Sequence, residues 1–249
     1  MIRDGVDLKE RDIRSFLLIG QSNMAGRGAF GEVPKIENSA CYMLRMGRWQ
    51  PMREPINPDR AIFEGKYSSG VGLGASFADA VAKQTGDRVG LIPCADGGTR
   101  IDQWMPGEIL FDHAVMMTRL AMRTSTLSGI LWHQGESDCK SDDMVLAHKE
   151  KFITMISALR EELGAQELPL LIGELAYGLT AREDMDERPL HMNEQYAAVA
   201  EQLPTCALVS AKDLTLKDDM LHFNSASLRE FGRRYASAYL ALTAEEQPG

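Results

Sequence analysis

Along this chain, short apolar runs alternate with longer segments in which apolar residues recur at helical spacing. This alternation is the sequence form of repeated strand–helix–strand units, which build a parallel sheet covered by helices. It predicts an α/β fold, a three-layer α/β/α sandwich around a central, mainly parallel sheet. The strands are expected at residues 16–19, 40–44, 89–93, 129–132, 170–173 and 207–210.

The segments between the strands carry apolar stripes that predict helices packed on the sheet. No repeat, low-complexity tract or linker divides the chain, so residues 1–249 are expected to form one domain with a loose tail after about residue 243. Residues 45–74 lack a clear period and predict a long surface loop. The stripes are Phe152, Ile156, Leu159 and Leu163; Tyr196, Val199 and Leu203; and Leu228, Phe231, Tyr235 and Tyr239.

Charge and cysteine spacing limit the class of protein. A formal net charge of -9 argues against nucleic acid or an anionic membrane as partner, since both are bound through clustered Lys and Arg. The four cysteines lie far apart, which favours free thiols over disulfides or a metal site. Residues 1–14 contain no apolar signal core, and no later run approaches a membrane span. A cytoplasmic location is expected, although removal of a signal peptide would leave the same pattern.

Ligands of open parallel sheets bind beyond the carboxyl ends of the strands, and two such ends carry a serine and paired glycines. Ser22 follows the first strand within GQSNMAG, where a tight turn would expose its hydroxyl and direct its N–H toward an oxyanion. A turn that merely caps the next helix is the simpler interpretation of Ser22 alone. Gly97 and Gly98, within CADGGTRIDQW, would let backbone N–H groups approach a ligand, or would simply form a turn.

Two further blocks carry histidines. WHQGESD follows the fourth expected strand and places His133 and Gln134 at the mouth of a buried strand, where polar groups need partners. In DDMLH, a separation of three residues can bring the Asp219 carboxylate to Nδ1 of His222 and leave Nε2 to accept the serine proton. The other three histidines fall in expected helices without such a partner and are expected at the surface: His113, His148 and His191.

These four blocks in this order resemble the SGNH (GDSL-like) hydrolases, and specifically the sialate O-acetylesterase and acetylxylan esterase family of carbohydrate esterases. The resemblance implies a flavodoxin-like SGNH hydrolase fold and a serine acetylesterase that needs no cofactor or metal. It implies Ser22 as nucleophile, His222 as base and Asp219 as the orienting acid. The implied oxyanion donors are the Ser22 N–H, the N–H of Gly97 or Gly98, and the Gln134 amide, which stands where the general SGNH pattern has Asn.

The expected substrate is a small or oligosaccharide acetyl ester, such as acetylated xylan or an acetylated sialic acid. The polar character of the second and third blocks favours acetyl over long acyl groups. Trp104 and Trp49 could stack on a sugar ring or pack in the core. The remaining candidates for substrate binding are Gln21, Glu136, and the two arginines suited to a carboxylate, Arg60 and Arg100.

Three other functions stay open at this stage. A broad short-chain arylesterase or thioesterase of the same fold would use the same residues. A metal-dependent hydrolase could recruit His133, Glu136, Asp138 and His222, but would leave Ser22 and Asp219 unexplained. A non-catalytic sugar-binding module is a further alternative, because fold does not fix function. The natural sugar, the position of its acetyl group and the oligomeric state do not follow from the sequence.

Overall fold

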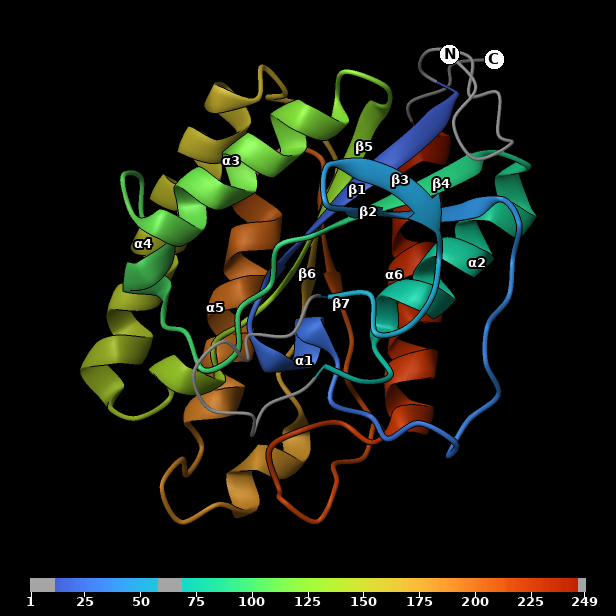
Figure 1. Cartoon of the computed structure of the whole chain (residues 1–249). Coiled ribbons are helices and arrows are strands. Elements are labelled where there is room, and N and C mark those ends of the chain that lie inside the picture. The colour runs from blue at the N-terminus through green and yellow to red at the C-terminus, as the bar shows by residue number, and fades with distance from the viewer. Residues whose placement is uncertain (1–11, 58–68, 246–249) are drawn as a thin grey trace.

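The computed structural model describes residues 12–57 and 69–245 and shows a central sheet between two layers of helices (Figure 1). The sheet has the strand order β3-β2-β4-β1-β5-β6-β7, and every pairing except β2 with β3 is parallel. The strands are β1 (Ile13–Gly20), β2 (Cys41–Arg45), β3 (Arg48–Pro51), β4 (Arg88–Pro93), β5 (Thr126–His133), β6 (Leu170–Gly173) and β7 (Cys206–Val209).

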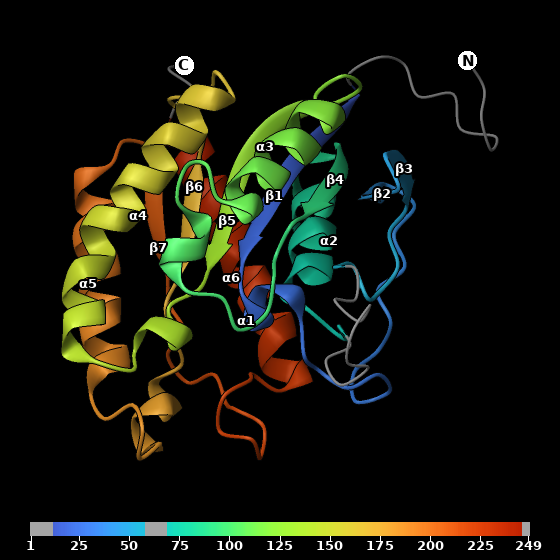
Figure 2. The same cartoon turned by 60° about the vertical axis from the view of Figure 1, so that its left-hand side comes forward.

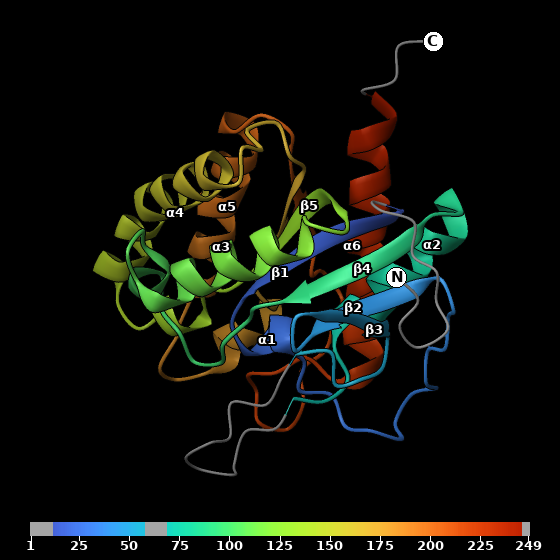
Figure 3. The same cartoon turned by 45° about the horizontal axis from the view of Figure 1, so that its top comes forward.

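The helices cover both faces of this sheet. Figures 2 and 3 show α2 and α6 on one face and α3, α4 and α5 on the other, while α1 lies at the carboxyl end of β1. The helices are α1 (Ser22–Ala25), α2 (Leu73–Thr85), α3 (Ile109–Ala121), α4 (Asp142–Glu162), α5 (Arg188–Gln202) and α6 (Ser225–Glu245). Three single turns complete the set: η1 (Ile101–Trp104), η2 (Glu136–Asp138) and η3 (Tyr177–Ala181).

The expected α/β sandwich is confirmed, and the apolar stripes form its core. β1 and β5 are buried over nearly their whole lengths, as strands covered on both faces must be. Of the expected helical stripes, every member is buried except Leu203, which ends α5. Helix α6 runs on to Glu245, two residues past the expected start of the tail. No helix within residues 12–57 and 69–245 has the length and apolar character needed to cross a membrane.

The expected loop at residues 45–74 is wrong in part, because it contains β3 and the start of α2, and its residues 58–68 lie outside the described residues. Met46 and Gly47 both have positive φ, 51° and 72°, which is the geometry of a two-residue hairpin turn. The turn folds Arg48–Pro51 back against β2 as an antiparallel edge strand. Trp49 lies on this strand, half-buried, and its Nε1 donates to Thr124 Oγ1 at 3.1 Å.

His148 also departs from expectation, since it is fully buried in α4. Its Nε2 lies 2.9 Å from the hydroxyl of Tyr196, which in turn donates to the Gln134 carbonyl oxygen at 2.6 Å. Nε2 thus finds its partner 48 residues away along the chain, whereas Nδ1 has no hydrogen-bond partner among the described residues. His191 is exposed and His113 half-buried.

Candidate active site

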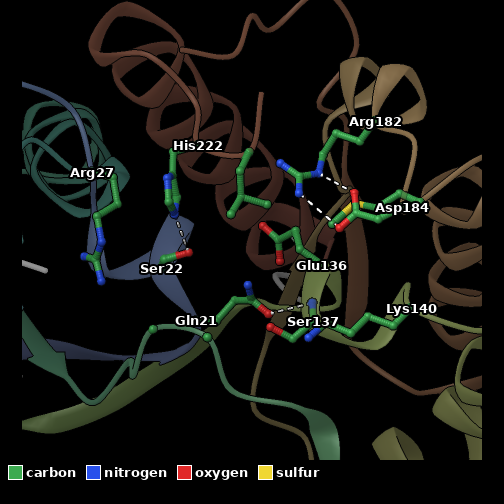
Figure 4. A pocket seen from close by; sticks show the side chains of 13 residues that line it. Gln21, Ser22, Arg27, Glu136, Ser137, Lys140, Arg182, Asp184 and His222 are labelled. Carbon is green, nitrogen blue, oxygen red and sulfur yellow. Dashed lines mark hydrogen bonds and ion pairs between the residues drawn. The ribbon is translucent and has the colours of Figure 1, made fainter. Parts of the chain in front are cut away.

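A cavity of about 450 Å³ opens at the carboxyl ends of the parallel strands (Figure 4). Segments that follow β1, β4, β5 and β6 line it, together with the segment that precedes α6. Residues far apart in the sequence meet here because parallel strands end at one edge of the sheet. The lining residues are Gln21, Ser22, Arg27, Gly97, Gly98, Glu136, Ser137, Lys140, Arg182, Asp184, Met185, Leu221 and His222.

Ser22 stands on a tight turn between β1 and α1. Gly20, with φ of 129°, ends the strand, and a Cβ at this position would lie 2.0 Å from the carbonyl oxygen of His133. Only glycine permits this close approach of β1 to the end of β5. The next N–H, that of Gln21, donates to the same oxygen at 2.8 Å. The main chain then turns into α1, so that Ser22 faces the cavity.

Ser22, His222 and Asp219 form a continuous hydrogen-bonded relay. The hydroxyl oxygen of Ser22 lies 2.9 Å from Nε2 of His222, and Nδ1 of His222 lies 2.8 Å from Oδ2 of Asp219. The acid and the imidazole are three residues apart, while the serine is 200 residues from the histidine. The structure thus brings together the three side chains expected to form the triad.

Hydrogen bonds determine the charge of Asp219. Partial burial by itself raises the pKa of this carboxyl, but the N–H and the imidazole of His222 and the N–H of Leu221 lower it more, so that the pKa falls to about 2. Oδ1 accepts from the two N–H groups at 2.9 and 3.0 Å, which leaves Oδ2 for the imidazole. Asp219 is therefore an anion at neutral pH and favours the tautomer of His222 that carries its proton on Nδ1.

Asn23 connects the turn that carries Ser22 to the segment that carries His222. Its Oδ1 accepts from the N–H of Phe223 at 3.1 Å, and its Nδ2 donates to the carbonyl oxygen of Leu221 at 3.3 Å. Both contacts are to the immediate neighbours of His222. Oε1 of Glu136, buried beneath the site, accepts from the same Nδ2 at 2.5 Å and fixes the amide. The other oxygen of Glu136 has no partner among the described residues.

Gly97 lies beside Ser22. A Cβ built on it would be 3.6 Å from Cβ of Ser22 and 2.7 Å from a guanidinium nitrogen of Arg27, so a side chain at this position would displace the arginine. Gly98 follows with φ of 74° and also lines the cavity. The glycine pair thus lies beside the serine, as the sequence predicted, while the choice between the two N–H groups stays a prediction.

Gln134 does not reach the cavity. Its side chain is fully buried, and Nε2 donates to Oδ2 of Asp138 at 2.6 Å and to the Thr99 carbonyl oxygen at 3.0 Å. Oε1 of Gln21 is a third acceptor at 3.3 Å, so both protons of this amide nitrogen are engaged within the protein. Trp104 is likewise a core residue: it is 1% exposed and meets Trp132 edge to face at 5.6 Å. The expected roles of Gln134 in the oxyanion hole and of Trp104 in sugar stacking are therefore corrected.

Of the two arginines expected to bind substrate, the structure describes only Arg100. Arg60 lies outside the described residues, and Arg100 is exposed and does not line the cavity. Arg27 and Arg182 line it instead, and Figure 4 shows them on opposite sides of Ser22. Arg182 pairs with Asp184 at 2.9 and 3.1 Å and donates to the Asp219 carbonyl oxygen at 3.3 Å.

Lys140 and Met185 line the same cavity and were not among the expected site residues. Arg182, Asp184 and Met185 follow β6, whose carboxyl end is a binding position by the same rule that located the other blocks. The charged run after η3 was the available signal.

The residues considered for a metal site are each engaged by hydrogen bonds to other groups. Nε2 of His133 faces the Glu174 carbonyl oxygen at 3.1 Å, and Asp138 binds the Gln134 amide and the N–H of Ile101. His222 belongs to the serine relay. Within the part of the chain that the structure describes, no group of three or more His, Cys, Asp or Glu is placed to hold a metal ion.

The four cysteines also lie outside the relay, and all are unpaired. Burial raises the pKa of Cys94 and of Cys206 to about 12, so neither thiol ionises at neutral pH. Ser22 is thus the candidate nucleophile of this cavity.

A family model described as "Carbohydrate esterase, sialic acid-specific acetylesterase" matches residues 12–241. The chain belongs to this carbohydrate esterase family. A probable carbohydrate esterase of Arabidopsis thaliana is 33% identical over 245 residues, which cover 91% of this chain and 90% of the plant protein. The chain is therefore a carboxylic ester hydrolase.

Solved structures agree with the fold. An Arabidopsis thaliana structure matches with a TM-score of 0.79 and 29% identity, covering 92% of this chain and 98% of that one. A carbohydrate acetylesterase of Xanthomonas citri matches with a TM-score of 0.68 and 19% identity, over 94% and 57% of the two chains. An aryl esterase of M. smegmatis matches with a TM-score of 0.57 and 14% identity, covering 92% of this chain and 99% of that one. This chain shares the flavodoxin-like SGNH hydrolase fold.

Proposed function

We propose that this protein removes O-acetyl groups from a carbohydrate by acyl transfer through Ser22. The observation that carries the proposal is the relay of Ser22, His222 and Asp219 on the wall of the cavity, with distances of 2.9 and 2.8 Å between the reacting atoms. Heavy atoms at these separations are within reach for proton transfer. Membership of the carbohydrate esterase family supports the substrate class.

The chemistry follows from the positions of the three groups. Ser22 Oγ attacks the acetyl carbonyl carbon while its proton moves to Nε2 of His222, and the carbonyl electron pair moves to the oxygen. When the intermediate collapses, the bond to the sugar oxygen breaks and His222 returns the proton to that oxygen. Water then repeats the sequence on the acetyl-serine, and acetate leaves. The Asp219 anion stabilises the imidazolium formed in each half-reaction.

The lining of the cavity suits a short acyl group and a polar alcohol. Among the described residues that line it, Met185 and Leu221 are the apolar side chains, whereas the charged side chains are Arg27, Lys140, Arg182 and Asp184. A long alkyl chain would need a continuous apolar channel, because each buried methylene contributes about 0.8 kcal/mol. Polar walls instead offer hydrogen bonds to sugar hydroxyls, and the cations Arg27 and Lys140 can also meet a sugar carboxylate.

Acetate release measured on three substrate groups tests this proposal: acetylated xylan oligomers, acetylated sialic acids and simple acetyl esters. An acetylated sugar is expected to give the highest kcat/KM, and the substrate group to which it belongs identifies the class of sugar. A parallel series of nitrophenyl esters from about two to eight carbons is expected to lose kcat/KM as the acyl chain lengthens. A kcat/KM that rises with chain length, or that is highest for simple aryl esters, would replace deacetylation by arylesterase activity.

A further inference from the structure

Lys217 opens the short loop that carries the acid and the base of the relay. Its N–H donates to the carbonyl oxygen of His222 at 2.7 Å, and the flanking residues Leu216 and Phe223 pair as an antiparallel bridge. Residues 217–222 therefore form a loop that is closed at its base, with Lys217 directly opposite His222.

The side chain of Lys217 extends from this loop toward the turn that carries Ser22. Its Nζ donates to the carbonyl oxygen of Arg27, two residues after the end of α1, at 3.0 Å. The same ammonium group lies 3.8 Å from Oδ2 of Asp219, the oxygen that faces Nδ1 of His222. The main chain of Arg27 thus holds a cation beside the carboxylate that supports the base.

The Asp219 carboxylate is shared between Lys217 and His222. Oδ1 accepts from the N–H groups of Leu221 and His222, so the ammonium and the imidazole both face Oδ2. A proton on Nε2 of His222 would place a second positive charge near this oxygen. Because like charges repel, the ammonium favours the neutral imidazole, which is the form that accepts the proton of Ser22.

The other ionisable groups around the relay come from several elements. Arg182, directly after η3, reaches the main-chain oxygen of Asp219 at 3.3 Å. Among the described residues, Lys217 and His222 are the groups that form an ion pair with the Asp219 carboxylate. Asp218, on the same loop, is exposed. The remaining ionisable side chains that line the cavity are Arg27 after α1, Glu136 in η2, Lys140 before α4 and Asp184 after η3.

We propose that Lys217, held in place by the main chain of Arg27, is a positioning residue that acts through Asp219 to keep His222 unprotonated. This inference rests on the proposed acyl transfer through Ser22. Lys217 itself exchanges no proton and touches no reacting atom. Its charge matters on the acid side of the pH range, where a protonated His222 cannot act as base.

Removal of the charge tests this role. Lys217→Met and Lys217→Gln are each expected to move the acid limb of the kcat/KM profile for 4-nitrophenyl acetate to higher pH by roughly half a unit. On that limb the variants are then about threefold slower than the wild type, whereas on the plateau the ratio is closer to one. Lys217→Arg, which keeps the charge, should retain the wild-type limb.

Salt gives a second readout that a structural role would not produce. The side chains of Lys217 and Asp219 are 37% and 40% exposed, so dissolved ions screen their interaction. The separation between the limbs of wild type and Lys217→Met should therefore shrink as the salt concentration rises from about 0.02 to 0.5 M. Lys212→Met is the matched control, because it removes the same charge from an exposed side chain on the same connection between β7 and α6. Its acid limb is expected to coincide with that of the wild type.

An acid limb that stays in place in both Lys217→Met and Lys217→Gln overturns the inference, even if their rates are lower at every pH. Equal displacement in Lys212→Met or in Lys217→Arg overturns it as well. Ser22→Ala, measured alongside, reports separately on the proposed function. Normal turnover by that variant rejects acyl transfer through Ser22, whereas an inactive Ser22→Ala together with unmoved limbs rejects the role of Lys217 alone.

Discussion

The N–H of Phe223 donates to Oδ1 of Asn23 at 3.1 Å, so the residue after Ser22 holds the residue after His222. The same amide binds the carbonyl oxygen of Leu221, on the other side of His222. The distance between Ser22 and His222 therefore depends on a side chain that does not itself react. Glu136 completes the arrangement by fixing the amide from below.

Asn23→Ala is expected to lower kcat by roughly 10–10², because a misplaced base costs about this much, and to leave KM nearly unchanged. It should also destabilise the fold by about 1–3 kcal/mol through the buried groups left without partners. Steady-state kinetics and urea unfolding measure both effects. Asn38→Ala is the control: this amide makes two hydrogen bonds, to Oδ1 of Asp79 and from the N–H of Ala40, and unlike Asn23 it holds no neighbour of His222. Equal losses of kcat in the two variants would disprove the positioning role.

Asp219→Asn is expected to lower kcat by about 10⁴, since an amide no longer holds the required tautomer of His222. Its effect on stability depends on pH. The folded pKa of about 2 lies below the ordinary value of 3.8, so the carboxylate stabilises the fold above 3.8 and loses this contribution as the pH falls toward 2. The Tm difference between wild type and variant should therefore have its full size at pH 5 and decrease as the pH is lowered further. A difference that grows on acidification would contradict the assignment.

Arg229 anchors α6 to the segment before α2. It forms a two-pronged ion pair with Glu54, and the two side chains are 7% and 10% exposed. Arg229→Met leaves the buried carboxylate unpaired and is expected to cost about 3–5 kcal/mol of unfolding free energy. Arg119→Met breaks a pair with Glu162 whose side chains are 57% and 49% exposed, and should cost less than about 1 kcal/mol. Urea unfolding compares the two, and equal losses would show that burial does not set the cost.

Strand positions and the location of the site were predictable from the sequence, because apolar runs mark buried strands and parallel strands end together. The directions of single side chains were not. Gln134 occupies the expected block, but a carboxylate four residues later binds its amide in the interior. Trp104 was equally compatible with a sugar platform and with the core. β3 escaped detection because its four residues, RWQP, show no alternation, and the turn before it uses a methionine at positive φ.

A serine-directed phosphonate is expected to inactivate the enzyme and to label Ser22, because the hydroxyl that attacks an ester also attacks phosphorus. Preincubation with a chelator should leave the rate of ester hydrolysis unchanged, as the relay requires no metal. Peptide mass spectrometry identifies the labelled residue. A label on another side chain, or a loss of activity on chelation that metal restores, would require a different mechanism.

Turnover of an acetyl ester by Ser22→Ala is the most direct test of the whole account. Ser22 lies on a turn at the cavity and makes its side-chain contact to His222, so removal of Oγ should leave the circular dichroism spectrum and Tm nearly unchanged. The expected loss of kcat is on the order of 10⁴–10⁶, as for other triad nucleophiles. A folded Ser22→Ala protein that releases acetate at the wild-type rate would contradict acyl transfer through this serine.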